Sequence, residues 1–219
     1  MNGQGMTLFC SHCAKDRLSI VKERENSDGV REYFARCSSC GEEISSPVLL
    51  QNNEWFRKEQ EILKKYNGMF LVAEGDPVPQ GRPRFSSYGG RFIHAYDPKE
   101  SVAYKIKLQW YIRMFFQRHP GFKPLEKNIF MDLRIYRKIP NSFTKKKREE
   151  ISKGLLYPNT KPDTDNYVKA VLDASNGLVF HDDSAVIGFT AFKYYSDLPR
   201  IEASFVEINS SQDIVFGIK

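Results

Sequence analysis

The 219-residue chain has no run of apolar residues that approaches the length a helix needs to cross a bilayer. Its first residues, MNGQGMTLFCSHC, also lack the basic start and the long apolar stretch of a signal peptide. On these two absences we expect a cytoplasmic protein that has no membrane partner. The apolar and aromatic content is nevertheless ample for a folded core, so disorder is not the expectation either.

Cysteine is scarce, and all four cysteines fall within the first 40 residues. Cys10, Cys13, Cys37 and Cys40 form two Cys-x2-Cys pairs with 23 residues between the pairs. In a reducing compartment this spacing predicts a tetrahedral Zn²⁺ site, because each short pair can present two thiolates to one ion. Two redox-active dithiols or unrelated buried thiols are the alternatives. Gly41 follows the last cysteine, where a glycine relieves the tight turn that such a site needs.

Residues between the two cysteine pairs are typical of a small β-hairpin. Two β-like stretches, 18–22 and 32–36, flank the turn-rich segment 25–29, which predicts a zinc ribbon over residues 1–50. A unit of this size depends on its metal for folding. Ribbons can bind DNA, bind protein or cap a neighbouring domain, and the sequence does not choose among these roles.

Positive charge is unevenly distributed along the chain. The formal net charge is +6, and residues 1–66 contain ten basic and ten acidic side chains, so the excess lies entirely in the remainder. A basic main domain suits a polyanionic partner such as nucleic acid, although many soluble proteins carry such a charge for solubility alone.

The pattern after residue 50 predicts a helical linker over 51–67, a main domain over 68–210 and a short tail over 211–219. Within the main domain strands and helices are mixed without regular βαβ alternation, so the predicted fold class is α+β with a partly antiparallel sheet and flanking helices. The expected elements are a strand at 69–74, a hairpin around 89–90, a helix ending near 118, a strand at 128–138, a short helix at 144–150, a helix at 163–176, and strands at 186–195 and 200–208. For the helix ending near 118, we expect Asp97 to cap it, Pro98 to be its first residue and Glu100 to complete a capping box.

Basic side chains that we expect to contact DNA lie in three places. Arg82 and Arg84 belong to the loop 75–85, in which prolines and glycines alternate with basic residues on a stiff scaffold, and Arg91 belongs to the hairpin. The third set is the basic run Lys145, Lys146, Lys147 and Arg148. This run can contact phosphates, or it can be the solvated face of a short helix.

Acidic residues gather at the start of the expected helix 163–176. Val168, Val171, Leu172 and Ser175 recur at helical spacing and turn one face to the core. Asp163 and Asp165 stand at the N-terminal end, and Lys169 lies one turn beyond Asp165. Helix capping for either aspartate, and a plain i, i+4 ion pair for Lys169, are the structural alternatives.

A second acidic pair, Asp182 and Asp183, follows the helix, and we expect a short connection to bring it beside the first. Four carboxylates at close range repel one another unless a cation neutralises them. Carboxylates without His or Cys suit Mg²⁺ or Mn²⁺, which leave positions for water and phosphate oxygens. His181 can be an exposed loop residue as readily as a base, and we leave it out of the site.

These residues resemble the signature of the RusA-type Holliday junction resolvases. The resemblance rests on Lys161-Pro-Asp-Thr-Asp-Asn-Tyr-Val-Lys169, Asp173, Asn176-Gly177, Asp182-Asp183, the loop 75–84 and Lys193-Tyr194, and it covers roughly residues 69–208. It implies a homodimeric, Mg²⁺-dependent endodeoxyribonuclease that makes paired symmetrical cuts in four-way junctions. It also implies that Asp163, Asp165 and Asp183 bind the metal, that Lys169 is catalytic and that Asp182 is a neighbouring acid of less defined role.

Two residues depart from the pattern of similar proteins, which tend to have Gln or Lys in place of Ala185 and Leu in place of Ser175. Neither position is expected to bind the metal, so these departures concern contacts with the substrate more than the chemistry. The leading hypothesis is a junction-resolving nuclease with an added zinc ribbon, of the kind that phages and prophages carry. A broader nuclease for flaps and forks, or a non-catalytic DNA-binding adaptor, are the alternatives; the intact acidic set argues against the adaptor.

Overall fold

The computed structural model describes residues 5–10, 13, 15–25, 31–44, 47–88 and 92–209. The chain divides into two compact units, Met1–Glu61 and Ile62–Lys219, and each is described by itself. Among the described residues, none of the helices combines the length and apolar character of a membrane span.

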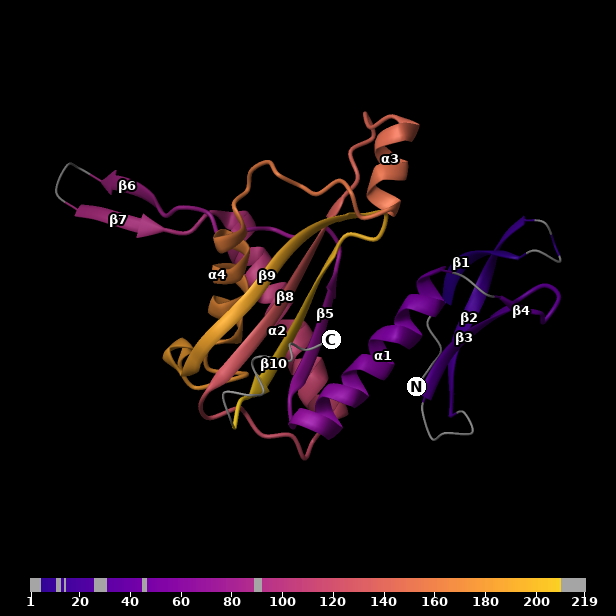
Figure 1. Cartoon of the computed structure of the whole chain (residues 1–219), viewed down its shortest axis with the longest axis horizontal. Coiled ribbons are helices and arrows are strands. Elements are labelled where there is room, and N and C mark those ends of the chain that lie inside the picture. Colours follow the sequence, from indigo (N-terminus) through magenta and orange to yellow (C-terminus); the bar gives the residue numbers. More distant parts are fainter. Residues whose placement is uncertain are drawn as a thin grey trace. The chain divides into compact units, whose positions relative to one another are not determined.

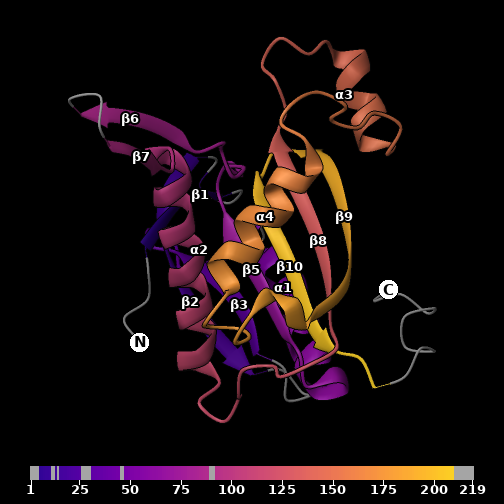
Figure 2. The ribbon, with the colours of Figure 1, turned by 90° about the vertical axis from the view of Figure 1, so that its left-hand side faces the viewer.

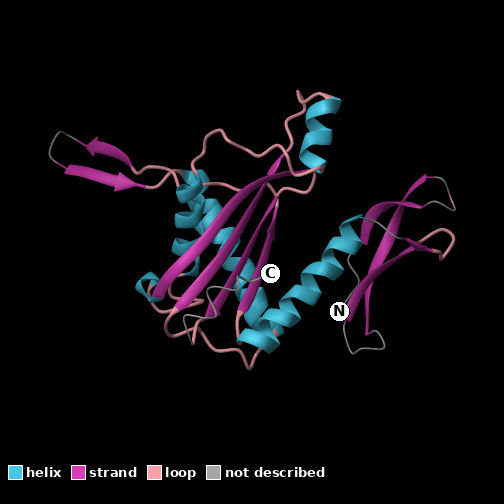
Figure 3. Cartoon of the chain, in the orientation of Figure 1, coloured by secondary structure: helices cyan, strands magenta, loops and turns pink. Residues whose placement is uncertain are grey.

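The N-terminal unit is built on one antiparallel sheet (Figure 3). Its strands, in the order in which they pair, are β1 (Gly5–Cys10), β2 (Lys15–Glu25), β3 (Arg31–Cys37) and β4 (Glu43–Ile44). The two stretches expected at 18–22 and 32–36 are therefore the centres of longer strands, and β1 and β4 add a strand at each side. The end of the expected turn, residues 26–29, lies outside the described residues.

Helix α1 (Pro47–Tyr66) begins several residues before the predicted start and ends where Asn67-Gly68 predicts. Asn67 has a φ of 46°, the left-handed conformation that ends helices. Gly68 is required for a different reason, because a Cβ there would lie 2.5 Å from the carbonyl oxygen of Phe205. The chain can therefore turn tightly from α1 into the sheet of the second unit.

The second unit contains a four-stranded mixed sheet with the order β5-β10-β8-β9. Strand β10 is antiparallel to both of its neighbours, whereas β8 and β9 are parallel, so the predicted α+β class with a partly antiparallel sheet is confirmed. The strands are β5 (Met69–Glu74), β8 (Ile129–Lys138), β9 (Val186–Ser196) and β10 (Arg200–Glu207).

Helices α2 (Lys99–Arg118) and α4 (Thr164–Ser175) cover one face of this sheet (Figures 1 and 2). Between helices and sheet lies the core, because alternate residues of β8 and one face of each helix are apolar, as the periodicity predicts. The central buried side chains are Ile129, Met131, Leu133 and Ile135 of β8, Leu108, Ile112 and Phe115 of α2, and Tyr167, Val168, Val171 and Ala174 of α4. The core thus fixes the position of α4, whose first turn carries the acidic residues.

One predicted helix start is wrong. Pro98, with a ψ of 138°, is the N-cap of α2 rather than its first residue, and no side chain caps the helix. Because the ψ of Pro98 is extended, the helix begins one residue later than expected. The backbone N–H of Val102 donates to the carbonyl oxygen of Pro98 at 3.1 Å. The capping box that Asp97 and Glu100 were expected to form is therefore absent from this helix.

Two smaller elements complete the second unit. The hairpin consists of β6 (Arg84–Tyr88) and β7 (Phe92–Tyr96), which pair with each other in a separate two-stranded sheet. Helix α3 (Lys145–Ser152) is capped by Thr144, whose hydroxyl accepts from the N–H of Lys147 over 3.4 Å.

Candidate active site

The start of α4 lies at the carboxyl ends of β8 and β9. These strands are parallel, and α4 belongs to the connection between them, so it must run back along the sheet. Residues 160–162 lead into α4, and they contact Arg137, near the end of β8, and Lys193, near the end of β9. In Figure 2 the chain from α3 accordingly enters α4 at the upper end of the sheet.

Asp163 and Asp165 are both exposed at this end of the sheet. Asp163 is the N-cap residue by position, but its side chain accepts no capping hydrogen bond. In the described part of the chain neither carboxylate forms a hydrogen bond or an ion pair. Capping therefore does not account for Asp163, and both carboxylates are available to bind a cation.

Lys169 lies one turn along α4 and is also exposed. Among the described residues, no ion pair joins it to Asp165, so the simple surface pair that its spacing allows is not formed. Its ammonium group is free to approach an anionic ligand on the same helix face as Asp165.

The peptide leading into α4 is held by two cations. Lys193 Nζ donates to the carbonyl oxygens of Thr160 at 3.1 Å and Pro162 at 3.0 Å. Arg137 Nη1 donates to the carbonyl oxygen of Lys161 at 3.2 Å. Residue-by-residue reasoning missed these two side chains, because each lies on a strand far from the acidic motif in sequence. Only the family resemblance drew attention to Lys193.

The stiff loop after β5 is attached to the first turns of both helices. The N–H of Gln80 donates to the carbonyl oxygen of Asn166 at 2.9 Å, and the N–H of Gly81 donates to Ser101 Oγ at 3.0 Å. Gly81 packs so tightly that a Cβ there would lie 2.7 Å from Cγ of Pro98. The loop is thus fixed beside the start of α4.

The basic residues carried by this loop lie at the same end of the sheet. Arg82 and Arg84 are exposed. Arg91, the third basic residue expected to contact DNA here, lies outside the described residues.

Two buried phenols lie beneath the loop. Burial raises the pKa of Tyr167, which Asp76 of the loop raises further and Arg137 opposes. Burial, followed by the neighbouring Tyr167, also raises the pKa of Tyr104 above its usual range. Both phenols therefore stay neutral at physiological pH and act as packing supports for the start of α4.

The second acidic pair does not join the first within one chain. Asp182 and Asp183 follow α4 and lie at the amino end of β9. The segment before them is joined to the segment that precedes β8, because the N–H of Leu125 donates to the carbonyl oxygen of Val179 at 2.7 Å. Ten helical residues, 166–175, lie between them and Asp165, and they extend over roughly 15 Å at about 1.5 Å per residue. The expected convergence was wrong because α4 traverses the sheet between the two pairs, so the connection does not fold back.

Asp182 has a local structural role at this end. Its carboxylate accepts from the N–H of Ser184 at 2.9 Å and so caps the single turn that precedes β9. Hydrogen bonds from the side chain and backbone of Ser184 lower the pKa of the Asp182 carboxyl. Asp183 is the first residue of this turn and is exposed.

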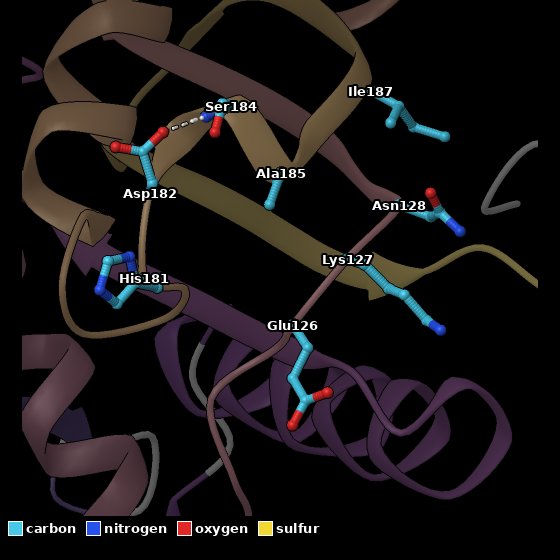
Figure 4. A pocket seen from close by; sticks show the side chains of 8 residues that line it. All are labelled: Glu126, Lys127, Asn128, His181, Asp182, Ser184, Ala185 and Ile187. Atoms are coloured by element: carbon cyan, nitrogen blue, oxygen red, sulfur yellow. Dashed lines mark hydrogen bonds between the residues drawn. The ribbon is translucent and has the colours of Figure 1, made fainter.

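An open pocket of about 390 Å³ lies beside this turn (Figure 4). Its lining combines side chains of both charges with two apolar side chains, and it consists of Glu126, Lys127, Asn128, His181, Asp182, Ser184, Ala185 and Ile187. Neither Asp163 nor Asp165 contributes to it, so the pocket and the start of α4 are separate features.

The basic run forms the first turns of α3. Lys145, Lys146 and Lys147 are exposed, as a phosphate contact requires. Arg148 is half-buried and donates to the carbonyl oxygen of Pro140 at 3.4 Å, with Asp197 at 3.7 Å. Arg148 therefore also holds α3 against the chain.

In the N-terminal unit, Cys13, Cys37 and Cys40 come together, with sulfur atoms within 4.8 Å of one another. The Cys13 and Cys37 sulfurs are 3.9 Å apart, close to the roughly 3.8 Å between two thiolates on a tetrahedral zinc with 2.3 Å bonds. Gly41 has a φ of 76°, as the tight turn requires. Cys10 ends β1, and its side chain lies outside the described part. The three sulfurs fit a zinc site.

Carboxylate oxygens at the start of α4 offer a different donor set. They are hard ligands, exposed and without other partners, which fits a Mg²⁺ or Mn²⁺ ion that keeps most of its water. Among the described residues, the cysteine trio is the group of three or more potential ligands that converges. One chain thus brings two aspartates to the carboxyl end of the sheet, and not three.

Comparison with known proteins adds two findings. The family described as "Endodeoxyribonuclease RusA" matches residues 74–207, which include both acidic pairs, the stiff loop and the basic run. The uncharacterized protein YqaN of Bacillus subtilis (strain 168) is 41% identical to this chain over 138 residues, which are 62% of this chain and 94% of YqaN. The N-terminal cysteine-rich unit lies outside the family match.

Proposed function

The chain belongs to the RusA family of endodeoxyribonucleases, which resolve Holliday junctions, and from this premise we propose that it cuts four-way DNA junctions with Mg²⁺ at the start of α4. The observation that carries the proposal is the pair of exposed, unpartnered carboxylates, Asp163 and Asp165, at a helix start fixed by the core. A polyanionic substrate would be repelled there unless a cation were bound.

The residues at the start of α4 have separate roles in the proposed reaction. Asp163 and Asp165 hold the ion, and Lys169 offsets charge on the phosphoryl oxygens. Lys193 positions the two aspartates through the carbonyl oxygens of Thr160 and Pro162. When bound, Mg²⁺ supplies an activated water and orients the scissile phosphate. Because the loop beneath is attached to α2 and α4, these groups stay aligned before DNA arrives.

The DNA path follows from the exposed basic side chains near this end. Arg82 and Arg84 belong to the loop attached to α4, and Lys145, Lys146 and Lys147 to α3. Their contacts with phosphates would position the duplex arms without reading bases. Arg91 is proposed as a further contact on sequence grounds.

We also propose that the N-terminal unit binds one Zn²⁺ through Cys13, Cys37 and Cys40, with Cys10 as the fourth ligand. The support is the convergence of the three described sulfurs and the spacing of the fourth. The ion would stabilise a unit with a small core.

A panel of labelled substrates tests the proposed function. A mobile four-way junction, a 5′ flap, a replication fork and a linear duplex of matched length are incubated with the protein and Mg²⁺. We expect the junction to be cut fastest, with cuts at symmetrical positions on two strands. Faster cutting of flaps or forks would assign a broader structure-selective nuclease, and binding without any cutting would assign a DNA-binding adaptor.

A further inference from the structure

The four-stranded sheet carries a group of aromatic rings on the face opposite α2 and α4. Tyr136 of β8 and Tyr194 of β9 are neighbours in the parallel ladder, and their rings stack with centroids 5.3 Å apart. Ile135 points into the core, so its neighbour Tyr136 points to the other face. Two further rings contact Tyr194, with centroids 5.9 Å away for Tyr157, from the segment between α3 and α4, and 6.4 Å away for Phe192 of β9. These four rings, from three parts of the chain, form one aromatic row.

The aromatic row lies at the same end of the sheet as the candidate active site. Tyr194 follows Lys193 directly, so their side chains point to opposite faces of β9. Lys193 Nζ donates to the carbonyl oxygen of Pro162, next to Asp163, at 3.0 Å. Figure 1 shows the segment between α3 and α4 at the upper end of the sheet, and Tyr157 belongs to this segment. The aromatic row and Asp163 therefore lie near the same end of β9, on different faces.

The inner end of the aromatic row packs against a buried ion pair. Arg200 Cζ lies 3.6 Å from the centroid of the Tyr136 ring, and Arg200 Nε donates to Glu202 at 2.7 Å. The two charged side chains are only 5% and 7% exposed. A ring that is stacked on a buried, paired cation has little freedom to lose when a ligand binds. The inner rings are thus a rigid support for the outer ones.

The outer rings of the aromatic row are exposed. Tyr157 is 51% exposed and Phe192 is 54% exposed, although each contacts the ring of Tyr194. Large exposed apolar groups that lie side by side mark binding surfaces more often than isolated ones do. Exposed aromatic rings on a rigid support are the kind of surface on which nucleobases stack.

Charge on the same face favours an anionic ligand. Along β8, Tyr136 lies between Arg134 and Lys138, because alternate residues of a strand share a face. Lys138 is exposed, and the Arg134 side chain is 35% exposed. Asp132 is the one acidic residue of β8 and β9, and its carboxylate is buried and accepts from Arg134 at 3.3 Å and from Thr190 at 2.6 Å. The charge that β8 presents to solvent beside the rings is therefore positive.

We propose that the aromatic row is a stacking platform for an unpaired nucleobase of the DNA substrate, which packs against Tyr157 and Phe192. Arg134 and Lys138 contact the phosphates next to that base. The inference rests on the proposed function, since that function brings DNA to this end of the sheet. Bases inside a continuous duplex are stacked on their neighbours and cannot reach the rings, whereas bases at a branch point can become unpaired. The platform therefore favours branched DNA without reading its sequence, because every base has a π-face.

Binding of single strands tests the platform without any cutting. The probes are a labelled thymidine oligonucleotide of roughly 12 nucleotides, within the usual range of single-strand sites, and an abasic strand of the same length and charge. Fluorescence anisotropy is measured with Ca²⁺ in place of Mg²⁺. We expect the wild type to bind the strand with bases at least about fivefold more tightly than the abasic strand, which is the lower end of what one stacked base contributes. Equal affinities for the two strands would overturn the platform.

Substitution of the exposed rings locates the base. Tyr157→Ala with Phe192→Ala should bind the two strands with equal affinity, whereas Tyr157→Phe with Phe192→Tyr keeps both rings and should keep the preference. The matched control is Ile106→Ala with Trp110→Ala, which removes equally exposed apolar side chains from α2 and should also keep it. A preference that survives the loss of both rings, or that is lost only in the α2 variant, would overturn the proposed position of the base.

A phosphate contact has a different signature from a stacked base. Lys138→Gln should weaken the binding of both strands by the same factor and leave the preference for bases unchanged, because the phosphates of the two strands are alike. Loss of the preference in this variant, or unchanged affinity for both strands, would overturn the role of Lys138.

Photochemical crosslinking of the wild type needs no variant to fold. A strand that contains 5-iodouracil should crosslink to peptides that contain Tyr157 or Phe192, and crosslinks confined to other peptides would overturn the platform. Asp165→Asn should retain the preference for bases, since the rings lie outside the metal site. A wild type that shows the preference but cuts no junction would contradict the proposed function alone, and cutting without the preference would overturn the platform alone.

Discussion

At the scale of single residues, the two acidic pairs differ in the hydrogen bonds that their carboxylates form. Asp182 has a structural task, since it caps the turn before β9. Asp163 occupies a capping position yet caps nothing, and Asp165 beside it has no partner in the described part of the chain. A carboxylate that the fold leaves without a partner is the better candidate for a metal ligand.

The cap at Asp182 predicts a specific titration. Since the hydrogen bonds from Ser184 lower the pKa of this carboxyl in the folded protein, the cap contributes stability above the usual carboxyl pKa and loses it as pH falls through the lowered value. We expect the carbon NMR signal of the Asp182 carboxyl to titrate at a lower pH than that of an aspartate without such hydrogen bonds. In Ser184→Ala the midpoint should move upward, because the side-chain hydrogen bond is removed; an unchanged midpoint would show that the hydroxyl does not contribute.

Lys193 predicts a positioning effect rather than a loss of ligands. Lys193→Met removes the donor that holds the carbonyl oxygens of Thr160 and Pro162, so the chain leading to Asp163 should shift. A displacement of about 1 Å can slow catalysis roughly 100-fold, and we expect cutting to fall by up to that factor.

The conservative variant Lys193→Arg separates positioning from simple loss of charge. It keeps the charge and a donor of similar reach, and it should recover part of the rate and shift the Mg²⁺ concentration for half-maximal cutting back towards wild type. Equal cutting rates for Lys193→Met and wild type would show that Lys193 does not position the aspartates.

At the scale of elements, the stiff loop is attached to α2 and α4, and Gly81 is the residue that packs closely against the start of α2. Gly81→Ala places a methyl group 2.7 Å from the rigid ring of Pro98, so the loop must shift away from α2. Such overpacking costs about 1–3 kcal/mol, and we expect a lower melting temperature together with weaker junction binding. Gly121→Ala is the control, since a Cβ at Gly121 meets nothing within 4 Å. Unchanged binding by Gly81→Ala would separate the loop from the DNA path.

Most elements of the second unit could be predicted because their apolar periodicity is strong and local. The alternation of Ile129, Met131, Leu133 and Ile135 gave β8 to within one residue, and helical spacing gave α4. Strand order could not be predicted, because pairing joins residues far apart in sequence. The predicted position of Asp183 was wrong for that reason. Local spacing suggested that Asp183 lies close to Asp165, but the parallel pairing of β8 and β9 requires α4 to run the length of the sheet between these two residues.

At the scale of the whole molecule, the two units offer different sets of potential metal ligands. Soft thiolates converge in the N-terminal unit, and hard carboxylate oxygens stand exposed in the second. The family match covers only the second unit, so the cysteine-rich N-terminal unit lies outside the nuclease domain.

Metal analysis of the purified protein tests the proposed zinc site. We expect about one zinc per chain in the wild type, and less than one-tenth of that in Cys37→Ser, because Cys37 is the buried member of the trio. The second unit should keep its cooperative unfolding transition in this variant, since its core is separate. Zinc-free wild-type protein with a folded N-terminal unit would contradict the proposed site.

In the proposed function, the carboxylates at the start of α4 bind a divalent ion with which the protein cuts branched DNA. The most direct measurement is the single-turnover cutting of a mobile four-way junction by wild type and Asp165→Asn, each with and without Mg²⁺, alongside junction binding in Ca²⁺. Asp97→Asn, an exposed carboxylate outside the site, is the control. We predict Mg²⁺-dependent cutting by wild type and control, a loss of roughly 1,000-fold or more in Asp165→Asn, and binding that is retained. Cutting by Asp165→Asn at the wild-type rate, or cutting by the wild type without a divalent ion, would contradict a metal-dependent active site at the start of α4.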